Sequence, residues 1–204
     1  MLTDSIAKQL KNYNLCYIFV SLHGLKKEHN LLVNGNFFKK AVEGFNVALR
    51  NGIPVIINIA VTSKNIQIIP QLLDFLSQLN ISAVQLSALY PAGNALLNKD
   101  IFPSQIQIMG LFDSIFSKQY LFKIRLHAFD KKGLEKFPID NCGAGREEIA
   151  VFPNGDVALC PAWKETYGNI LLDSKDIIVS NIQTAIYESQ KSCRDCNGCM
   201  LRSL

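Results

Sequence analysis

The cysteines of this 204-residue chain are concentrated towards one end of the sequence. Five of the six lie between Cys142 and Cys199, and the last three are separated by two residues each. The segment Met1–Asn14 has the pattern of a polar-faced helix and lacks the charged start, apolar middle and cleavage site of a secretion signal. In a chain kept in a reducing compartment, closely spaced cysteines are more often metal or cluster ligands than disulfides. The spacing therefore predicts a metal or cluster site.

A β-hairpin is expected between the first two of these cysteines, Cys142 and Cys160. The short apolar runs Ile149–Phe152 and Val157–Leu159 flank the stretch Pro153-Asn154-Gly155-Asp156. Asn-Gly supplies the positive backbone angles that a tight hairpin turn requires. The hairpin is expected to bring the two cysteines together.

Two kinds of site are open to these cysteines, an iron–sulfur cluster and a structural zinc ion. A zinc ribbon needs two paired cysteine knuckles, whereas Cys142 and Cys160 each stand singly. Gly143 and Gly145 let the backbone approach a cluster closely and direct amide donors at its sulfurs. The pattern favours iron–sulfur and keeps zinc as the alternative.

The first two thirds of the chain alternate between buried-strand and amphipathic-helix patterns. Strands are expected at Leu15–Leu22, Pro54–Val61, Ala83–Leu89 and Phe122–His127, and helices from Thr3 to about Lys11, at Phe37–Arg50, from Ile69 to Leu79 and between Pro103 and Lys118. Such alternation predicts an α/β fold with a parallel sheet and right-handed crossovers. A polar linker at residues 130–141 is expected to separate this part, residues 1–129, from the cysteine part, residues 142–204, where Ile182 and Ile186 indicate one more helix.

Composition limits the classes of partner. Hydrophobic residues make up 49% of the chain and charged residues 19%, which is typical of a folded soluble domain. The net charge of +4 is spread along the sequence without an arginine run, which speaks against nucleic-acid binding. The most apolar stretch, Ile53–Val61, is too short to cross a bilayer. These features predict a cytoplasmic protein that binds neither nucleic acid nor a membrane.

The order of motifs in the cysteine part is specific. It runs Cys142-Gly-Ala-Gly145, a hairpin with Pro153-Asn154-Gly155, Cys160-Pro161, Gly168-Asn169-Ile170 and Cys193-x-x-Cys196. This order resembles the SPASM extension, or the shorter twitch extension, of radical S-adenosylmethionine enzymes, which holds auxiliary four-iron four-sulfur clusters. Because one cluster takes four thiolates, we expect a single cluster. Its expected ligands are Cys142, Cys160, Cys193 and Cys196, with Cys199 as a spare or alternative.

The α/β part carries a second set of matching motifs. They are Val20-Ser21-Leu22-His23-Gly24, His29-Asn30, Gly35-Asn36-Phe37-Phe38, Gly52-Ile53-Pro54-Val55 and Leu89-Tyr90-Pro91-Ala92-Gly93-Asn94. They resemble the fourth to sixth strand–helix units of a radical S-adenosylmethionine barrel. The resemblance implies that Ser21 lies near the cofactor ribose and that backbone at Leu89 contacts the adenine. It implies an incomplete TIM-like parallel barrel followed by a small SPASM- or twitch-like domain of a hairpin and a helix.

Two family features are absent from the sequence. The C-x-x-x-C-x-x-C loop and the glycine-rich motif of the first half of the family barrel do not occur, and Leu31–Gly35 lacks the arginine that commonly follows the serine. We therefore expect the chain to be the C-terminal portion of a radical S-adenosylmethionine oxidoreductase or peptide-modifying enzyme, with no catalytic residues of its own assigned. S-adenosylmethionine is expected to bind only when the missing barrel half completes the fold, and the chain alone is not expected to cleave it.

An alternative function comes from a different class: a non-catalytic iron–sulfur or zinc module that binds a peptide or a partner protein. In either case three or four parallel strands cannot close into a barrel, so an open edge is expected to pair with the missing half or with a second copy of the chain.

Several remaining residues have structural interpretations. Cys16 is expected to be a small buried hydrophobe within its strand. His23, His29 and His127 are expected to be solvated or structural rather than ligands. Aromatic residues at helical spacing are expected to form core, namely Phe37, Phe38, Phe45, Phe112 and Phe116.

Overall fold

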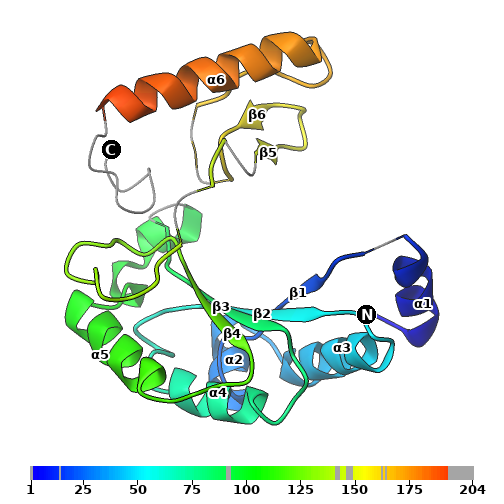
Figure 1. Ribbon diagram of the computed structural model, residues 1–204, viewed down its shortest axis with the longest axis vertical. Helices are drawn as coiled ribbons and strands as arrows, with labels where there is room; N and C mark the ends of the chain where they lie inside the picture. Colours follow the sequence, from blue (N-terminus) through cyan, green and yellow to red (C-terminus); the bar gives the residue numbers. More distant parts are fainter. Residues whose placement is uncertain are drawn as a thin grey trace. The chain divides into compact units, whose positions relative to one another are not determined.

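The structure is a computed structural model that describes residues 2–13, 15–90, 93–140, 143–145, 149–161, 163 and 165–192. The chain divides into two compact units (Figure 1). Unit 1 comprises Met1–His127 and Lys136–Pro138, and unit 2 comprises Ala128–Glu135 and Ile139–Leu204. Within the described residues, no helix has the length and apolar character needed to cross a bilayer.

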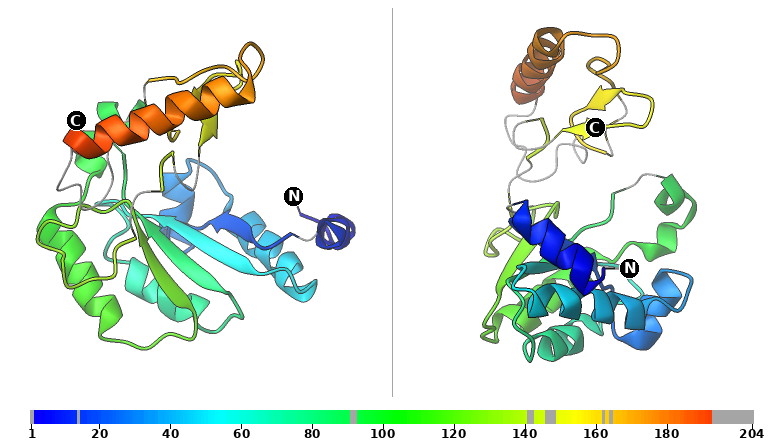
Figure 2. Two further views of the ribbon diagram at one scale, coloured as in Figure 1. Left: turned by 45° about the horizontal axis from the view of Figure 1, so that its top comes forward. Right: turned by 90° about the vertical axis from the view of Figure 1, so that its right-hand side faces the viewer.

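Unit 1 is built on a four-stranded parallel sheet with helices along one face (Figures 1 and 2). The strands lie in the order β1 (Ile18–Ser21), β2 (Val55–Ala60), β3 (Ala83–Ser87) and β4 (Lys123–His127). The helices are α1 (Asp4–Asn12), α2 (Lys26–Leu32), α3 (Phe38–Arg50), α4 (Ile69–Leu76) and α5 (Gln105–Phe116), with short 3-10 turns η1 (Gly93–Leu97) and η2 (Lys99–Ile101). The predicted α/β alternation and parallel sheet are confirmed.

The side chains that point towards the helices are apolar in every strand. They form two rows: Val20, Ile57, Val84 and Ile124, then Leu22, Ile59, Leu86 and Leu126. Most of them have no solvent exposure, as have the inward residues of α4, which include Leu72 and Leu76. Alternation along each strand sends the other side chains to the opposite face, which none of helices α2–α5 covers (Figure 2). We call this opposite face the open face.

Local sequence explains where the helices begin. The Thr3 hydroxyl accepts a hydrogen bond from the Ile6 N–H at 3.3 Å and caps α1. Helix α5 begins with a capping box, in which Ser104 and Gln107 satisfy each other's backbone N–H groups.

Three predictions about local structure were wrong. Helix α2 occupies a stretch where no helix was predicted; it packs through the buried His29. Cys16 is exposed and precedes β1 instead of lying buried within it, because pairing with β2 begins only at Ile18. The core prediction failed for two of its five aromatic residues.

Phe37 and Phe116 are the two exceptions, with exposed fractions of 48% and 39%. Each lies at a helix end, where the helical spacing no longer directs the side chain into the core: Phe37 precedes α3 and Phe116 is the last residue of α5. Phe45 and Phe112 are fully buried as expected.

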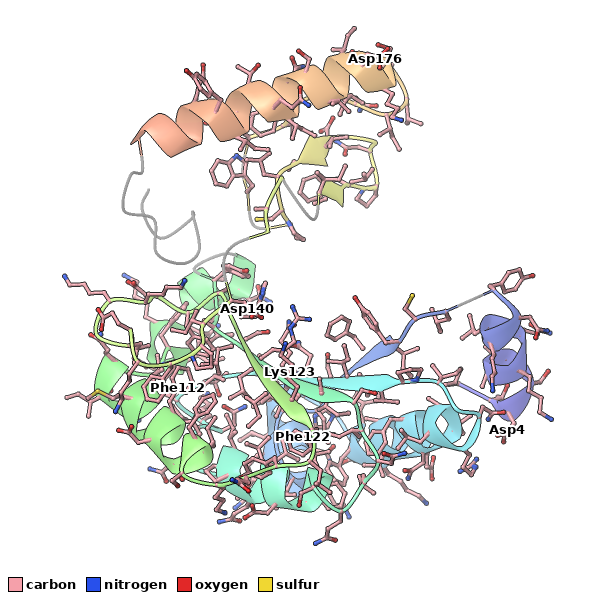
Figure 3. The ribbon with its side chains drawn as sticks, viewed as in Figure 1. Asp4, Phe112, Phe122, Lys123, Asp140 and Asp176 are labelled. Atoms are coloured by element: carbon pink, nitrogen blue, oxygen red, sulfur yellow. The ribbon has the colours of Figure 1, made fainter. Side chains whose placement is uncertain are left out.

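The stretch predicted as a polar linker makes apolar contacts along its described residues, 130–140. Leu134 and Ile139 are buried, with 2% and 7% of their surface exposed. The Phe137 ring packs edge-on against Phe112 at a centroid distance of 5.1 Å (Figure 3 labels Phe112). This stretch therefore contributes side chains to packed cores.

Unit 2 contains the predicted hairpin, with β5 (Ala150–Val151) antiparallel to β6 (Val157–Ala158), and one long helix, α6 (Lys175–Ser192). Its core consists of Ala144, Val157, Leu159, Cys160, Ile178 and Ile182. Helix α6 lies along the hairpin in all views (Figures 1 and 2) and contributes Ile178 and Ile182 to this core.

The Gly168-Asn169-Ile170 motif runs beside the hairpin. Val157 donates its N–H to the Gly168 carbonyl at 2.8 Å, and Ile170 donates to the Gly155 carbonyl at 2.9 Å. The Asn169 side-chain amide donates to Asn154 O at 3.0 Å and to Asp156 Oδ1 at 2.9 Å. The motif therefore fixes the turn of the hairpin from the side.

The hairpin turn depends on Gly155. Its φ of +90° lies in the region that favours glycine, while Asn154 keeps a negative φ, so only one of the two expected positive angles is present. A Cβ at this position would lie 2.6 Å from Asn169 Oδ1. Both the backbone angle and the close contact therefore select glycine.

We predict that Gly155→Ala destabilises unit 2 by about 1–3 kcal/mol, because it adds backbone strain and displaces Asn169. Gly44→Ala is the matched control: Gly44 lies inside α3 with nothing within 4 Å of the added Cβ, so it should stabilise unit 1 by about 0.5–1 kcal/mol. Urea unfolding measures both, by fluorescence of Trp163, the single tryptophan, for unit 2 and by far-ultraviolet circular dichroism for unit 1. If Gly155→Ala left the urea midpoint of unit 2 unchanged, the turn would not depend on glycine at this position.

Candidate functional site

A polar row crosses the open face of the sheet in register. The row consists of Ser21, Asn58, Gln85 and Arg125, one residue from each strand. Ser21 is exposed, and the other three are partly buried. We call these four residues the polar row. A line of hydrogen-bonding side chains on the face opposite the core is a candidate ligand-binding surface.

Two further rows flank the polar row on the same face. Phe19, Ile56, Ala83 and Lys123 precede it, and Ala60, Ser87 and His127 follow it. No aspartate or glutamate occurs in any of the four strands. The strands therefore present donors, cations and apolar surface on the open face, but no carboxylate.

Hydrogen bonds order the side chains of this face. The Ser87 hydroxyl donates to Asn58 Oδ1 at 2.8 Å, and Gln85 Nε2 donates to Ser87 Oγ at 3.3 Å. The Tyr90 hydroxyl lies 3.4 Å from His127 Nε2. The amide and hydroxyl groups are thereby held in fixed orientations before any ligand binds.

Asn65 ties together the chain segments that follow β1 and β2. Its side chain is fully buried. Its amide donates to His23 O at 2.7 Å and to Ala60 O at 2.8 Å, and its Oδ1 accepts from the N–H of Thr62 at 2.7 Å and from the Thr62 hydroxyl at 2.9 Å. The two N–H donors of the Asn65 amide thus bind one carbonyl after β1 and one in β2, while its oxygen binds Thr62. These contacts join the carboxyl ends of the first two strands rigidly.

The two histidines near β1 are neutral and hold backbone groups, which is the structural one of the two roles expected for them. His23 Nδ1 accepts the Ala60 N–H at 3.2 Å, and His29 Nδ1 accepts the His23 N–H at 3.1 Å, so each ring carries its proton on Nε2. Burial, reinforced by the neighbouring His29, lowers the pKa of His23 to about 4. Burial also lowers the pKa of His29. These rings hold the backbone in place.

The two cofactor-binding residues predicted from sequence lie at the carboxyl ends of strands. Ser21 ends β1, and Leu89 follows β3 by two residues and is partly buried. In open parallel sheets, ligands bind outside the carboxyl ends of the strands. The position of both residues is therefore suited to the predicted role, which stays a prediction.

Of the five predicted cysteine ligands, only Cys160 lies among the described residues. Cys142, Cys193, Cys196 and Cys199 lie outside them. Among the residues that the structure describes, no three His, Cys, Asp or Glu side chains gather in a group that could hold a metal ion.

Cys160 lies in the core of unit 2 with only 6% of its surface exposed. Gly145, three residues after Cys142 in sequence, donates its N–H to the carbonyl of Leu159 at 3.0 Å. Gly145 is thereby paired with the residue that precedes Cys160; the predicted proximity of Cys142, which lies outside the described residues, stays a prediction. The Cys160 thiol lies among apolar residues such as Ala144, Val157 and Leu159, which shield it from water, and its role as a cluster ligand stays a prediction.

An aromatic network packs beside this cysteine. Trp163 Nε1 donates to the Tyr167 hydroxyl at 2.9 Å, and that hydroxyl donates to Glu165 Oε2 at 2.9 Å. Both rings pack against the core that contains Cys160. Burial, with the Glu165 carboxylate second, raises the pKa of Tyr167, so the phenol stays protonated as a donor.

Sequence reasoning missed Asn58, Gln85 and Arg125. Each is a polar residue with an apolar residue on either side in its strand, in INI, VQL and IRL. A polar residue that interrupts a buried strand is the signal that points to these positions. The sequence does not show that the three are aligned with one another.

No protein-family model matches the chain. Two curated relatives are similar to about half of it. A probable GTP 3′,8-cyclase of Sulfurisphaera tokodaii is 30% identical over 104 residues, which are 50% of this chain and 32% of the relative. A probable GTP 3′,8-cyclase of Sulfolobus acidocaldarius is 32% identical over 109 residues, which are 52% of this chain and 34% of the relative. The chain thus matches about a third of the length of these relatives.

Two solved structures share the fold. They are native anSMEcpe with bound AdoMet and a Kp18Cys peptide, and the same protein with AdoMet and a Cp18Cys peptide. Each has a TM-score of 0.66 and 17% identity, and the match covers 97% of this chain and 63% of the solved chain. The chain therefore has an α/β fold, with a four-stranded parallel sheet, like that of these AdoMet-bound proteins. The chain is thus similar in sequence to two probable GTP 3′,8-cyclases and in fold to an AdoMet-bound protein, in agreement with the resemblance to radical S-adenosylmethionine enzymes that the sequence motifs indicate.

We predict that acid destabilises unit 1 through His23. Its pKa of 6.5 in an unfolded chain falls to about 4 on folding, so the unfolded state takes up a proton first as the pH drops. His23 therefore does not lower the free energy of unfolding above pH 6.5. Between pH 6.5 and about 4, its protonation lowers that free energy by up to about 3 kcal/mol. A ¹³C-edited NMR titration of the histidine Cε1–H signals measures this pKa, with the urea-unfolded chain as reference. In His23→Gln, whose side-chain oxygen can accept the same N–H, the pH dependence should weaken. A folded His23 that titrates near 6.5 would contradict the prediction.

Proposed function

We propose that this chain is a C-terminal portion of a radical S-adenosylmethionine enzyme of the oxidoreductase or peptide-modifying type. The observation that carries the proposal is the open face, where four parallel strands present an ordered polar row opposite a helix-covered core. The bound AdoMet and peptide named for the structural neighbours support both the cofactor and a peptide substrate or partner.

In this proposal unit 1 is part of a barrel whose interior is the open face. The cofactor lies at the carboxyl ends of the strands, with Ser21 near its ribose and Leu89 near its adenine. The rigid join made by Asn65 supports this role, because it holds the segment after β1 in place while a ligand enters.

Unit 2 is proposed to be a SPASM- or twitch-like domain that holds one auxiliary four-iron four-sulfur cluster. The ligands are Cys142, Cys160, Cys193 and Cys196, with Cys199 as a spare. The burial of Cys160 and the pairing of Gly145 with Leu159 support this assignment. When bound, such a cluster transfers single electrons.

Completion of the barrel is proposed to come from residues outside the 204 printed here. They would supply the C-x-x-x-C-x-x-C cluster loop from a separate barrel half, whereas a second copy of the chain would cover the open edge without supplying that loop. Strand β1 ends the sheet order, and Tyr17 and Phe19 beside its edge expose 46% and 48% of their surfaces. An edge strand with exposed aromatic residues is suited to pairing with a partner strand.

A second candidate is a non-catalytic module that binds a peptide or partner protein through unit 2. The observation that favours it is apolar surface: Ile149 and Val151 on the hairpin are half exposed, and Leu171 and Leu172 are exposed by 73% and 83%. In this case the cysteines hold iron–sulfur or zinc for structure alone.

We predict that anaerobic reconstitution with iron and sulfide loads about four iron ions per chain and produces visible absorption. Cys160→Ser should abolish most of this absorption because it removes a buried ligand. Cys16→Ser is the control: Cys16 is exposed and precedes β1, so loading should be unchanged. Iron and sulfide analysis, with metal analysis by mass spectrometry, measures the outcome. Stoichiometric zinc without iron-dependent absorption would refute the cluster and favour the zinc form of the second candidate.

We predict that the reconstituted chain alone, given dithionite and S-adenosylmethionine, yields no 5′-deoxyadenosine by chromatography. Reductive cleavage needs a cluster with an open iron site that chelates the amino and carboxylate groups of the cofactor, and four cysteines leave no such site on the auxiliary cluster. Product should appear when a polypeptide that carries the C-x-x-x-C-x-x-C loop is added. Multiple turnovers by the chain alone would refute the proposal that cofactor cleavage depends on a cluster loop supplied by another polypeptide.

A further inference from the structure

The turn between α2 and α3 carries two large apolar side chains that face solvent. Leu31 of α2 exposes 67% of its surface, and Phe37, the residue before α3, exposes 48%. The turn is short, since Asn34 donates its N–H to the Leu31 carbonyl at 3.3 Å. The two exposed side chains therefore flank one turn and form a candidate contact surface.

Leu31 faces outward because the other side of α2 is anchored. His29 is buried, its Nδ1 accepts the His23 N–H at 3.1 Å, and its ring packs edge-on against Phe38 at a centroid distance of 6.1 Å. Leu31 lies two residues further on, which is about 200° around a helix, so it points away from that anchor. Lys27 lies one turn before Leu31 and shares its face.

Phe37 is held in place by the backbone of the turn although half of it is exposed. A Cβ added to Gly35 would overlap the Phe37 ring, so the ring lies directly against that glycine. Asn34 adopts a positive φ of 50°, which is uncommon for a residue with a side chain. The Asn30 side-chain oxygen accepts the N–H of Phe38 at 2.9 Å and ties the turn to the start of α3. The exposed ring therefore has a fixed position before any partner binds.

Lysines surround the two apolar side chains. Residues 24–42 contain four lysines and one glutamate, namely Lys26, Lys27, Lys39, Lys40 and Glu28. All four lysines are exposed. Lys40 Nζ lies 5.4 Å from the centroid of the Phe37 ring, and Lys39 forms an ion pair inside α3. Within the described part of the chain, no ion pair involves Lys26, Lys27 or Lys40, so these three keep their charge available to a partner.

These side chains define a surface that we call the α2–α3 patch, made of Lys26, Lys27, Leu31, Phe37 and Lys40. We propose that the α2–α3 patch is a docking surface for an acidic segment of a partner protein that also carries apolar side chains. Carboxylates of the segment bind the lysine ammonium groups, and an apolar side chain of the segment covers Leu31 and Phe37. Charge complementarity of this kind raises the association rate and selects acidic partners over basic ones. Burial of the two exposed side chains supplies affinity.

The composition of the patch favours a protein segment over other anionic surfaces. Helix α2 has seven residues with charged side chains in its first turn, so it lacks the long apolar face with which an amphipathic helix enters a bilayer. Nucleic acids are bound by cations distributed along a backbone, whereas the three available lysines here stand around an apolar centre. Helices α2 and α3 do not cover the open face, so the inference goes beyond the proposed cofactor site and does not depend on it.

The test uses the full chain and a synthetic peptide, acetyl-Glu-Asp-Leu-Glu-Phe-Asp-Glu-amide. Fluorescence anisotropy of a labelled copy measures its affinity, and ¹⁵N NMR locates it on the chain. At low salt we expect a dissociation constant of about 0.1–1 mM and shifts of the amide signals of residues 26–40. A peptide with Ser in place of Leu and Phe, and a peptide with Lys in place of the acidic residues, should each bind about fivefold more weakly or worse. Neither measurement requires a loaded cluster or turnover, so failure of the proposed function leaves this test intact.

Three variants separate a specific site from general attraction. Lys27→Glu should weaken binding of the acidic peptide by about fivefold or more, because it replaces an ammonium group of the patch by a carboxylate. Gly35→Ala should weaken it by about threefold or more, since the added Cβ displaces the Phe37 ring while every charge remains. Lys8→Glu is the matched control: it makes the same charge change at an exposed position of α1, and affinity should stay within about twofold.

The inference is overturned if the peptide does not bind at millimolar concentration, if its NMR shifts lie outside residues 26–40, or if Lys8→Glu weakens binding as much as Lys27→Glu. It is also overturned if vesicles that contain phosphatidylserine bind the patch and the peptide does not, or if sedimentation shows a dimer that Lys27→Glu dissociates. A bilayer or a second copy of the chain would then be the occupant. Circular dichroism checks that each variant is folded. If Gly35→Ala does not fold, Phe37→Ser, which alters a half-exposed residue, tests the same contact.

Discussion

The register of the four parallel strands is the constraint on which the rest of unit 1 depends. Because side chains alternate with a period of two, a slip of one residue would move every apolar side chain from the helices to the open face. The observed register keeps Ile57, Val84 and Leu126 in the core. The same register aligns Asn58, Gln85 and Arg125 across the sheet, so the packing of the core and the formation of the polar row have one cause.

The carboxyl ends of β1 and β2 combine this order with rigidity. Asn65, fully buried, holds both following segments through backbone hydrogen bonds, and His23 and His29 remain neutral acceptors for backbone N–H groups. A site that binds a flexible cofactor gains affinity when its own groups are already placed, because fewer of them lose freedom on binding. These buried polar groups therefore connect stability with the proposed function.

Unit 2 uses a different physical solution. Its core is small, so turn geometry and side-chain amides carry much of the order: Gly155 adopts a positive φ, and Asn169 binds the turn from the side. Cys160 is buried next to this framework, with Trp163 and Tyr167 packed against the same core. In the proposed cluster site, a thiol held in this way would be positioned by its surroundings before metal binds, which would limit the ordering cost of cluster assembly.

Sequence by itself determined the α/β alternation and the hairpin, because each depends on residues close in the chain: periodicity and turn residues. Sequence reasoning failed at α2, which packs through a buried histidine, and at Cys16, because strand pairing begins only after it. It also failed at Phe37, which lies at the end of a helix. Only the tertiary structure revealed the polar row. Residues 21, 58, 85 and 125 are far apart in sequence, and their alignment is fixed by hydrogen bonds between strands, which no local pattern specifies.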